Sequence, residues 1–125
     1  MDDRSVAATL PSTPANPPAD AGVVIVLITV PEANAKGLSR HLVEDGLAAC
    51  VNQLPGVHST YTWAGRVEEA DETLLYVKTT LARYGELERR VRELHPYEMP
   101  EMLAVPVAAG FGPYLDWIKR SVSPP

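Results

Sequence analysis

The stretch that decides the fold is a long run of extended-type residues between positions 48 and 80. It reads Ala-Ala-Cys-Val-Asn-Gln-Leu-Pro-Gly-Val-His-Ser-Thr-Tyr-Thr-Trp (48–63), turns at Ala64-Gly65, and returns to Leu-Leu-Tyr-Val-Lys-Thr-Thr (74–80). This pattern predicts one β-hairpin. An arm of that length would extend for about 50 Å at ~3.3 Å per residue, whereas a domain of about 100 residues is roughly 35 Å across. The arm must therefore bend, project into solvent or pair with another copy of the chain.

Two further patterns describe the hairpin itself. Pro55-Gly56 should bend or bulge the first arm, because a proline cannot donate a hydrogen bond to a neighbouring strand. The alternation of a strand places Ser59, Tyr61 and Trp63 on one face. The acidic run Glu68–Glu72 lacks the spacing of a calcium loop, so we interpret it as a solvated flank of the hairpin.

Strands and helices alternate around this hairpin. Val23–Val30 is apolar on both faces, as in a strand that is buried on both sides. A helix should follow from Pro31 to just before Gly46, and its inward residues are expected to be Ala35, Leu38, Leu42 and Val43.

The second half of the chain completes the pattern. A second helix is expected over residues 82–94, a strand over 101–108 with Pro106 at a sheet edge, and a terminal helix over 114–122. The order β-α-β-β-α-β with a C-terminal helix predicts an α+β, ferredoxin-like plait with a long β-hairpin. Both inner strands look apolar on both faces, so self-association through the open face of the sheet is expected.

Composition sets the domain organisation and the compartment. Residues 1–22 are rich in proline and small polar residues, which predicts a disordered N-terminal leader, followed by one domain over 23–122 and a tail over 123–125. A single cysteine, Cys50, excludes an internal disulfide. With no membrane-length apolar run and no secretory signal pattern, the cytoplasm is the expected location.

Charge and motifs argue against several function classes. A net charge of −5 disfavours nucleic acid as the main partner. Phosphate loops, zinc-protease motifs, nucleophile elbows and paired redox cysteines are all missing from the sequence. We therefore expect no enzymatic activity; a lysine beside carboxylates, whose pKa could be tuned, is the one feature that keeps catalysis open.

The segment 95–101 holds the richest set of polar side chains. It reads His-Pro-Tyr-Glu-Met-Pro-Glu, so two prolines fix the backbone between an imidazole, a phenol and two carboxylates. The segment is either a preorganised binding loop or a turn in which His95 caps a helix.

Three residues outside this segment could also take part. Cys50 is either a soft ligand or, as its small apolar neighbours favour, a packed core thiol. Lys78 on a buried strand needs a carboxylate partner, for which Glu98 or Glu101 is expected. His58 on the long arm could face either side of it.

Several motifs in order resemble the CutA family of divalent-cation tolerance proteins. They are Thr-Val-Pro (29–31), Leu-Ala-Ala-Cys-Val-Asn (47–52), Pro-Gly-Val-x-Ser-x-Tyr-x-Trp-x-Gly-x-Val-Glu (55–68), Lys-Thr-Thr (78–80), His-Pro-Tyr-Glu-x-Pro-Glu (95–101) and Tyr-Leu-x-Trp (114–117). The resemblance covers about residues 23–122. It implies a ferredoxin-like subunit in a homotrimer, similar to the nitrogen-regulatory signal proteins that bind small ligands between subunits.

The resemblance also implies a set of site residues. The polar residues that match the family motifs, and that would form a ligand-binding cleft, are Cys50, Trp63, Lys78, His95, Tyr97, Glu98 and Glu101. In some bacterial members copper ligands occupy the places of Ile28, Leu94 and His95. Because two of these three side chains are aliphatic here, that copper mode is not expected in this chain.

Two hypotheses follow from the resemblance. The first is a cytoplasmic homotrimer for divalent-cation tolerance, copper in particular, with weak metal binding by His95 and a carboxylate at inter-subunit clefts and no required cofactor. The second is a signalling-type trimer that binds a small anionic metabolite or a protein partner in the same clefts, with Lys78 as the charge contact. Neither hypothesis involves nucleic acid or a membrane.

Overall fold

A four-stranded antiparallel sheet with the order β2-β3-β1-β4 organises the molecule. The computed structural model describes residues 22–124, so the expected leader lies outside the described residues except for Gly22. The strands are β1 (Val23–Val30), β2 (Cys50–Trp63), β3 (Arg66–Thr80) and β4 (Leu103–Pro106), and the helices are α1 (Glu32–Glu44), α2 (Tyr84–Leu94) and α3 (Gly112–Val122), with a short 3-10 helix η2 (Leu81–Arg83) before α2. This order confirms the predicted α+β, ferredoxin-like plait.

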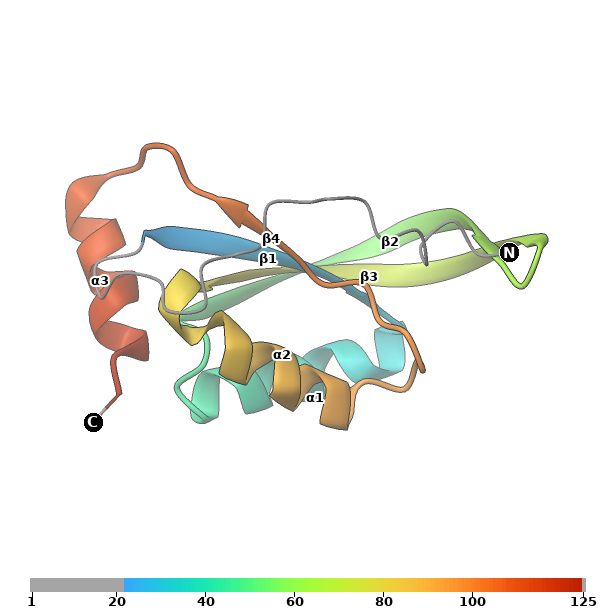
Figure 1. The fold of residues 1–125 in the computed structure, drawn as a ribbon, viewed down its shortest axis with the longest axis horizontal. Coiled ribbons are helices and arrows are strands. Elements are labelled where there is room, and N and C mark those ends of the chain that lie inside the picture. The colour runs from blue at the N-terminus through green and yellow to red at the C-terminus, as the bar shows by residue number, and fades with distance from the viewer. Residues whose placement is uncertain (1–21, 125) are drawn as a thin grey trace, which may run out of the picture.

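The helices α1 and α2 cover one face of the sheet (Figure 1). Fully buried residues of β1 and β3, such as Ile28 and Leu75, pack there against Leu42 of α1 and Leu87 of α2. Burial of each such aliphatic side chain is worth roughly 1.5–3 kcal/mol. This layer is therefore the hydrophobic core that holds the sheet and the two helices together.

Val43 was expected in the core, and that prediction is wrong. Its side chain is 44% exposed. The buried residues of α1 instead include Ser39, whose hydroxyl donates a hydrogen bond to the carbonyl of Ala35 at 2.7 Å. Because this bond satisfies its polar group, Ser39 takes part in the buried stripe, and Val43 falls outside it in the last turn of the helix.

The hairpin is longer than the sheet that supports it. β2 and β3 pair along their whole length, but β1 pairs only with Thr73–Thr80 of β3. The distal part of the hairpin, residues 57–72, is thus a two-stranded ribbon, and it projects beyond the other strands (Figure 1). We call residues 57–72 the ribbon.

Two special backbone sites shape the hairpin. A register shift between Leu54 and Val57 contains Gly56 at a φ of +78°, which confirms the predicted bulge at Pro55-Gly56. Ala64 and Gly65 have φ values of +52° and +78°, as both central residues of a type I′ turn require. The right-handed twist of that turn type matches the twist of the two strands.

The second face of the sheet is only partly covered by the described helices. The outermost strand β4 carries Leu103 and Val105, which are 56% and 46% exposed and lie opposite Leu27 and Ile25 of β1. Helix α3 contacts β1 and β3 at the end of the sheet away from the ribbon, where its Ile118 is buried (Figure 1). Ile25 and Leu27 thus give β1 its expected second apolar face, whereas β3 carries Lys78 on that face.

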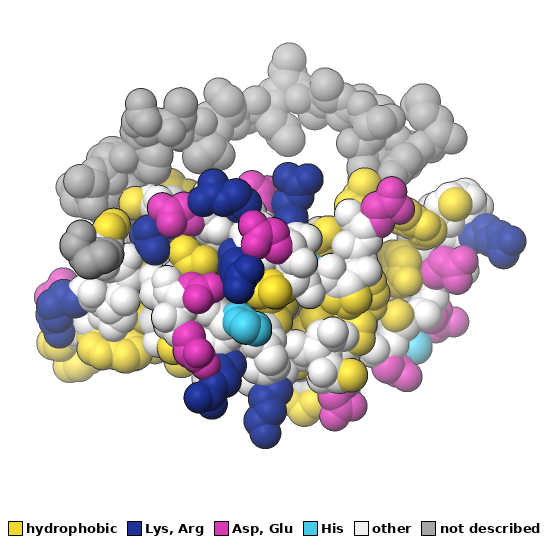
Figure 2. Space-filling model, turned by 90° about the horizontal axis from the view of Figure 1, so that it is seen from below, with side chains coloured by type: hydrophobic (Ala, Val, Ile, Leu, Met, Phe, Trp, Pro, Cys, Tyr) yellow, Lys and Arg dark blue, Asp and Glu magenta, His cyan; other side chains and the backbone are white. Residues whose placement is uncertain are grey.

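The helical face of the molecule carries both charged and apolar regions. On the helical face acidic and basic side chains are interleaved, and hydrophobic side chains gather toward the side where the ribbon projects (Figure 2).

Pro106 lies in the edge strand β4, as predicted for a proline in a sheet. Among residues 22–124, no helix combines the length and the apolar character that a membrane crossing requires.

Candidate functional site

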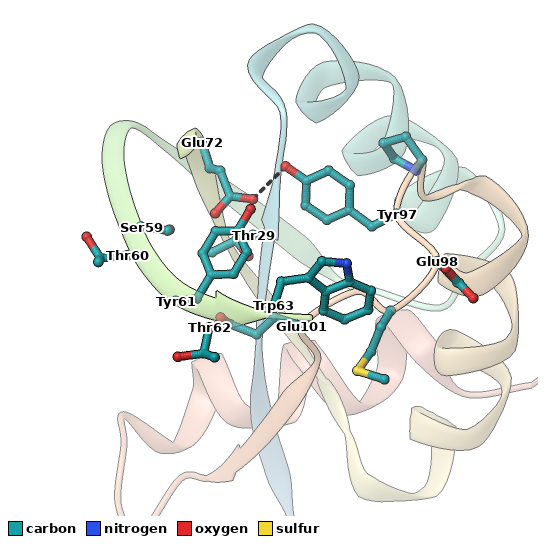
Figure 3. A pocket seen from close by; sticks show the side chains of 12 residues that line it. Thr29, Ser59, Thr60, Tyr61, Thr62, Trp63, Glu72, Tyr97, Glu98 and Glu101 are labelled. Carbon is teal, nitrogen blue, oxygen red and sulfur yellow. Dashed lines mark hydrogen bonds between the residues drawn. The ribbon is translucent and has the colours of Figure 1, made fainter. Parts of the chain in front are cut away.

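A cleft of about 680 Å³ lies between the ribbon and the loop that joins α2 to β4 (Figure 3). It is lined by Thr29 of β1, residues 59–63 of β2, Glu72 of β3, and residues 96–99 and Glu101 of the loop. Three segments that are far apart in the sequence therefore meet here. We refer to this space as the cleft.

Strand alternation decides which ribbon side chains reach the cleft. Ser59, Tyr61 and Trp63 lie on one face of β2, as predicted. Glu72 lies opposite Val57 in the register, so it belongs to the same face of the ribbon. The ribbon therefore offers two aromatic rings and one carboxylate to the cleft.

The loop is anchored by His95, which is 7% exposed. Its Nε2–H donates a hydrogen bond to the carbonyl oxygen of Thr29 at 2.8 Å, and its Nδ1 accepts one from the backbone N–H of Tyr97 at 3.1 Å. Only a neutral imidazole with its proton on Nε2 satisfies both bonds. His95 is the C-cap residue of α2, since its backbone N–H donates to the carbonyl of Val91 at 2.7 Å, while its ring joins the loop to Thr29 of β1.

Tyr97 continues this network toward the ribbon. Its ring lies 4.8 Å from that of His95, and its hydroxyl donates a hydrogen bond to Glu72 at 2.9 Å (Figure 3). Burial, followed by the hydrogen bond and the charge of Glu72, raises the pKa of Tyr97 to about 12. The phenol therefore stays protonated at neutral pH and keeps its role as a donor.

Glu72 is the site residue that sequence reasoning missed. It was interpreted as part of a solvated acidic flank, but its side chain is 5% exposed. The available signal was the strand alternation, because Glu72 precedes Leu74, Tyr76 and Lys78 at two-residue steps on a strand that enters the core. Glu69 and Asp71 of the same acidic run fall on the opposite face of the strand.

We expect His95→Ala to lower the free energy of unfolding by about 2–4 kcal/mol, because it leaves the Thr29 carbonyl and the Tyr97 N–H without partners and opens a void. His41→Ala, at an exposed position of α1, is the matched control and should change stability by less than about 0.5 kcal/mol. Denaturant unfolding at fixed protein concentration measures both. Equal stability of the two variants would contradict a structural role for His95.

Of the residues expected in the cleft, two lie elsewhere within the protomer. Lys78 lies opposite Ile25 near the start of β1, and its ammonium group donates to Asn52 and approaches the Cys50 sulfur at 3.9 Å. Within one protomer Lys78 therefore does not pair with Glu98 or Glu101. The physical reason is distance along the sheet, because the loop meets β1 near its other end, at Thr29.

The other expected residues are found together. Trp63, Tyr97, Glu98 and Glu101 all line the cleft, and His95 lies directly behind Tyr97. Three of the lining residues are carboxylates, since Glu72 joins Glu98 and Glu101. No lysine or arginine lines the cleft among the residues that the structure describes. Its electrostatic character is therefore acidic.

The cleft does not contain a preformed strong metal site. Across residues 22–124, no group of three His, Cys, Asp or Glu side chains is arranged to hold a metal ion. Ile28 is fully buried in the core, so its place offers no ligand atom, and His95 has no free ring nitrogen. A tight site for copper or zinc needs several donors held together.

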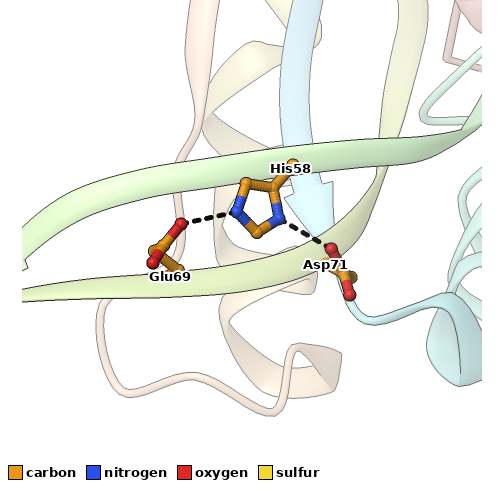
Figure 4. Close-up of polar contacts among 3 residues, drawn as sticks. All are labelled: His58, Glu69 and Asp71. Carbon is orange, nitrogen blue, oxygen red and sulfur yellow. Dashed lines mark hydrogen bonds and ion pairs between the residues drawn. The ribbon is translucent and has the colours of Figure 1, made fainter.

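A separate polar cluster lies on the ribbon (Figure 4). The Nδ1 of His58 contacts Asp71 and its Nε2 contacts Glu69, each at 2.7 Å. The hydrogen bond to Asp71, followed by that to Glu69, raises the pKa of His58 above 6.5. His58 therefore faces the two acids of β3, on the ribbon face opposite to the cleft residues.

We expect His58 to titrate above its ordinary value of 6.5, since both carboxylates favour the charged ring. A raised pKa in the folded state means that this contribution to stability is complete below 6.5 and is lost as the pH rises through the folded pKa. NMR titration of the histidine rings measures it, with His41 as the internal reference. Asp71→Asn should lower the His58 pKa, and an unchanged value would contradict the geometry.

Comparisons with known proteins agree on one family. The family model described as CutA1 divalent ion tolerance protein matches residues 24–121. A relative from Thermus thermophilus, the divalent-cation tolerance protein CutA, is 50% identical over 98 residues, or 78% of this chain and 95% of the relative. The solved structure of that organism's CutA1 has a TM-score of 0.79 at 48% identity, covering 81% of this chain and 99% of that chain. A structure described as the PII-like protein CutA from Nostoc sp. PCC 7120 has a TM-score of 0.76 at 36% identity, covering 80% and 97%.

Proposed function

Because the chain belongs to the CutA family of divalent-ion tolerance proteins, we propose that it acts in tolerance of divalent cations as a homotrimer whose clefts bind cations. The observation that supports this best is the lining of the cleft. It carries the carboxylates of Glu72 and Glu98, and among residues 22–124 no lysine or arginine is part of this lining. Such a cleft attracts cations and repels anions.

We propose that bare divalent metals bind weakly in the cleft. The donors would be loop and ribbon carboxylates, with His95 joining them only after one of its two hydrogen bonds is released. The cost of releasing a buried hydrogen bond lowers the net affinity. This arrangement favours copper and zinc over harder ions only to the extent that the imidazole takes part.

Titration calorimetry with copper and with zinc tests the metal proposal. Wild-type protein should bind both ions weakly, and Glu98→Gln should weaken binding because it removes a charge at an exposed place in the cleft. Glu44→Gln, on the exposed side of α1, is the matched control. Identical isotherms for wild type and His95→Ala would remove His95 from the donor set.

The homotrimer is supported by two surfaces that a single protomer leaves exposed. One is the apolar face of β4 with Leu103 and Val105, and the other is the ribbon, whose Val67 is 74% exposed. A two-stranded ribbon is marginally stable on its own in water. We propose that a neighbouring copy covers both surfaces. Val67 lies opposite Thr62 in the register, on the ribbon face away from Tyr61, so this contact would leave the cleft open.

We expect light scattering to give a mass of three times the 13.6 kDa of the chain. Leu103→Glu should shift the protein toward smaller species, because it places a charge on the exposed apolar face of β4. Val43→Glu makes the same type of change at an exposed position of α1 and is the matched control. A wild-type protein that remains a stable monomer would contradict the proposal.

The structure does not favour an anionic metabolite as the ligand of the cleft. Lys78, the charge contact that this hypothesis needs, is engaged with Asn52 outside the cleft of its own protomer. We propose a cytoplasmic location and a non-enzymatic role, because the chain has a single free cysteine and lacks a nucleophile-and-base motif.

A further inference from the structure

We infer that the cleft binds a small organic cation, a compound with an ammonium or quaternary ammonium group, in preference to a bare metal ion. This inference rests on the proposed function only in taking the cleft as a binding site. It names the class of ligand that the side chains of the cleft would recognise. The features that favour this ligand are the buried carboxylate of Glu72, three aromatic rings and the size of the cleft between them.

The first observation is the buried carboxylate. Glu72 is 5% exposed. In the described part of the chain, its carboxylate accepts a hydrogen bond from the neutral hydroxyl of Tyr97. No arginine, lysine or histidine of the described residues forms an ion pair with it. A carboxylate can accept several hydrogen bonds, and burying it without a counter-charge is unfavourable. A cationic ligand would supply both the charge and the missing donors.

The second observation is the aromatic wall. Tyr61, Trp63 and Tyr97 line the cleft, and Figure 3 shows their rings around the space next to the Glu72 carboxylate. Each ring is partly exposed, at 37–41%. The face of an aromatic ring attracts an organic cation by roughly 0.5–2 kcal/mol, depending on how far the contact is desolvated. Aromatic faces give no comparable ligand atoms to a small, hard metal ion.

The third observation is that the tyrosine is already in place. The backbone N–H of Tyr97 donates to His95, its ring lies against the His95 imidazole, and its hydroxyl is held by Glu72. A ring that is fixed before binding loses little conformational freedom when the ligand arrives. His95 acts here as a positioning residue, since it holds the wall of the cleft without being part of its lining.

Size and charge agree with this ligand class. The cleft of about 680 Å³ lies within the usual range for small-molecule sites, roughly 300–1,000 Å³. Glu98 adds negative charge from the loop side of the cleft, which also favours a cation. The lack of a three-donor group among residues 22–124 disfavours a bare metal ion. An organic cation is the ligand that all these features share.

Titration calorimetry of the full-length protein with choline chloride tests the inference. The uncharged comparison is 3,3-dimethylbutan-1-ol, which replaces the quaternary nitrogen by carbon at nearly the same shape. We expect choline to bind and the neutral alcohol to bind at least tenfold more weakly. Equal binding of the two compounds, or binding of neither, would overturn the inference.

Variants identify the groups responsible. Glu72→Gln keeps an acceptor for the Tyr97 hydroxyl but removes the charge, and it should weaken choline binding at least tenfold. Trp63→Leu should weaken it by roughly 2- to 30-fold, the range expected for one cation–π contact. Glu44→Gln on the exposed side of α1 is the matched control, because Glu44 lies on a helix and does not line the cleft, and it should bind like wild type. Unchanged binding by Glu72→Gln would overturn the inference.

Circular dichroism and light scattering on each variant separate a lost ligand contact from a lost fold or assembly. Failure of choline binding in a protein that remains trimeric and binds copper or zinc would overturn the organic-cation inference alone. Choline binding without any metal binding would support it, and would remove metal binding from the proposed function.

Discussion

The pairing of β3 with two partners of unequal length is the constraint on which the rest of the structure depends. β1 reaches only Thr73–Thr80 of this strand, whereas β2 follows it along its whole length. The unequal pairing leaves residues 57–72 as a two-stranded ribbon beyond the core. Because the loop after α2 meets β1 close to the point where the ribbon begins, the same mismatch that exposes the ribbon also creates the cleft. The exposed ribbon and the cleft thus have one structural origin.

The local features of the fold could be predicted from the sequence because short-range sterics and periodicity determine them. Pro55-Gly56 predicted a bulge in the first arm, Ala64-Gly65 predicted the hairpin turn, and Pro106 predicted an edge strand. The double-sided apolar pattern of Val23–Val30 likewise indicated a central strand. Val43 was placed wrongly because periodicity alone did not show that a self-bonded serine, Ser39, could share the buried stripe.

The site was harder to predict because its contacts join residues that are distant in the sequence. His95 and Thr29 are 66 positions apart, and Tyr97 and Glu72 are 25 apart. The motif around His95 left two interpretations open, a preorganised loop or a turn that caps a helix, and nothing local showed where its side chains would bond. Glu72 looked like one acid among several, and Lys78 looked close to the loop acids until the register separated them. Whether a charged side chain is buried depends on tertiary contacts, and the residues next to it in the sequence do not reveal it.

The role of His95 follows from what its ring already does. A histidine in a motif shared by a cation-tolerance family suggests a metal ligand, but both nitrogens of this ring are used to join β1 to the loop. The chemistry of the cleft then falls to groups that His95 positions, above all Tyr97 and the carboxylate that Tyr97 contacts. A buried acid beside aromatic faces recognises a diffuse positive charge better than a compact ion that demands several fixed donors. The side chains of the cleft therefore suit a diffuse positive charge better than a tightly coordinated metal ion.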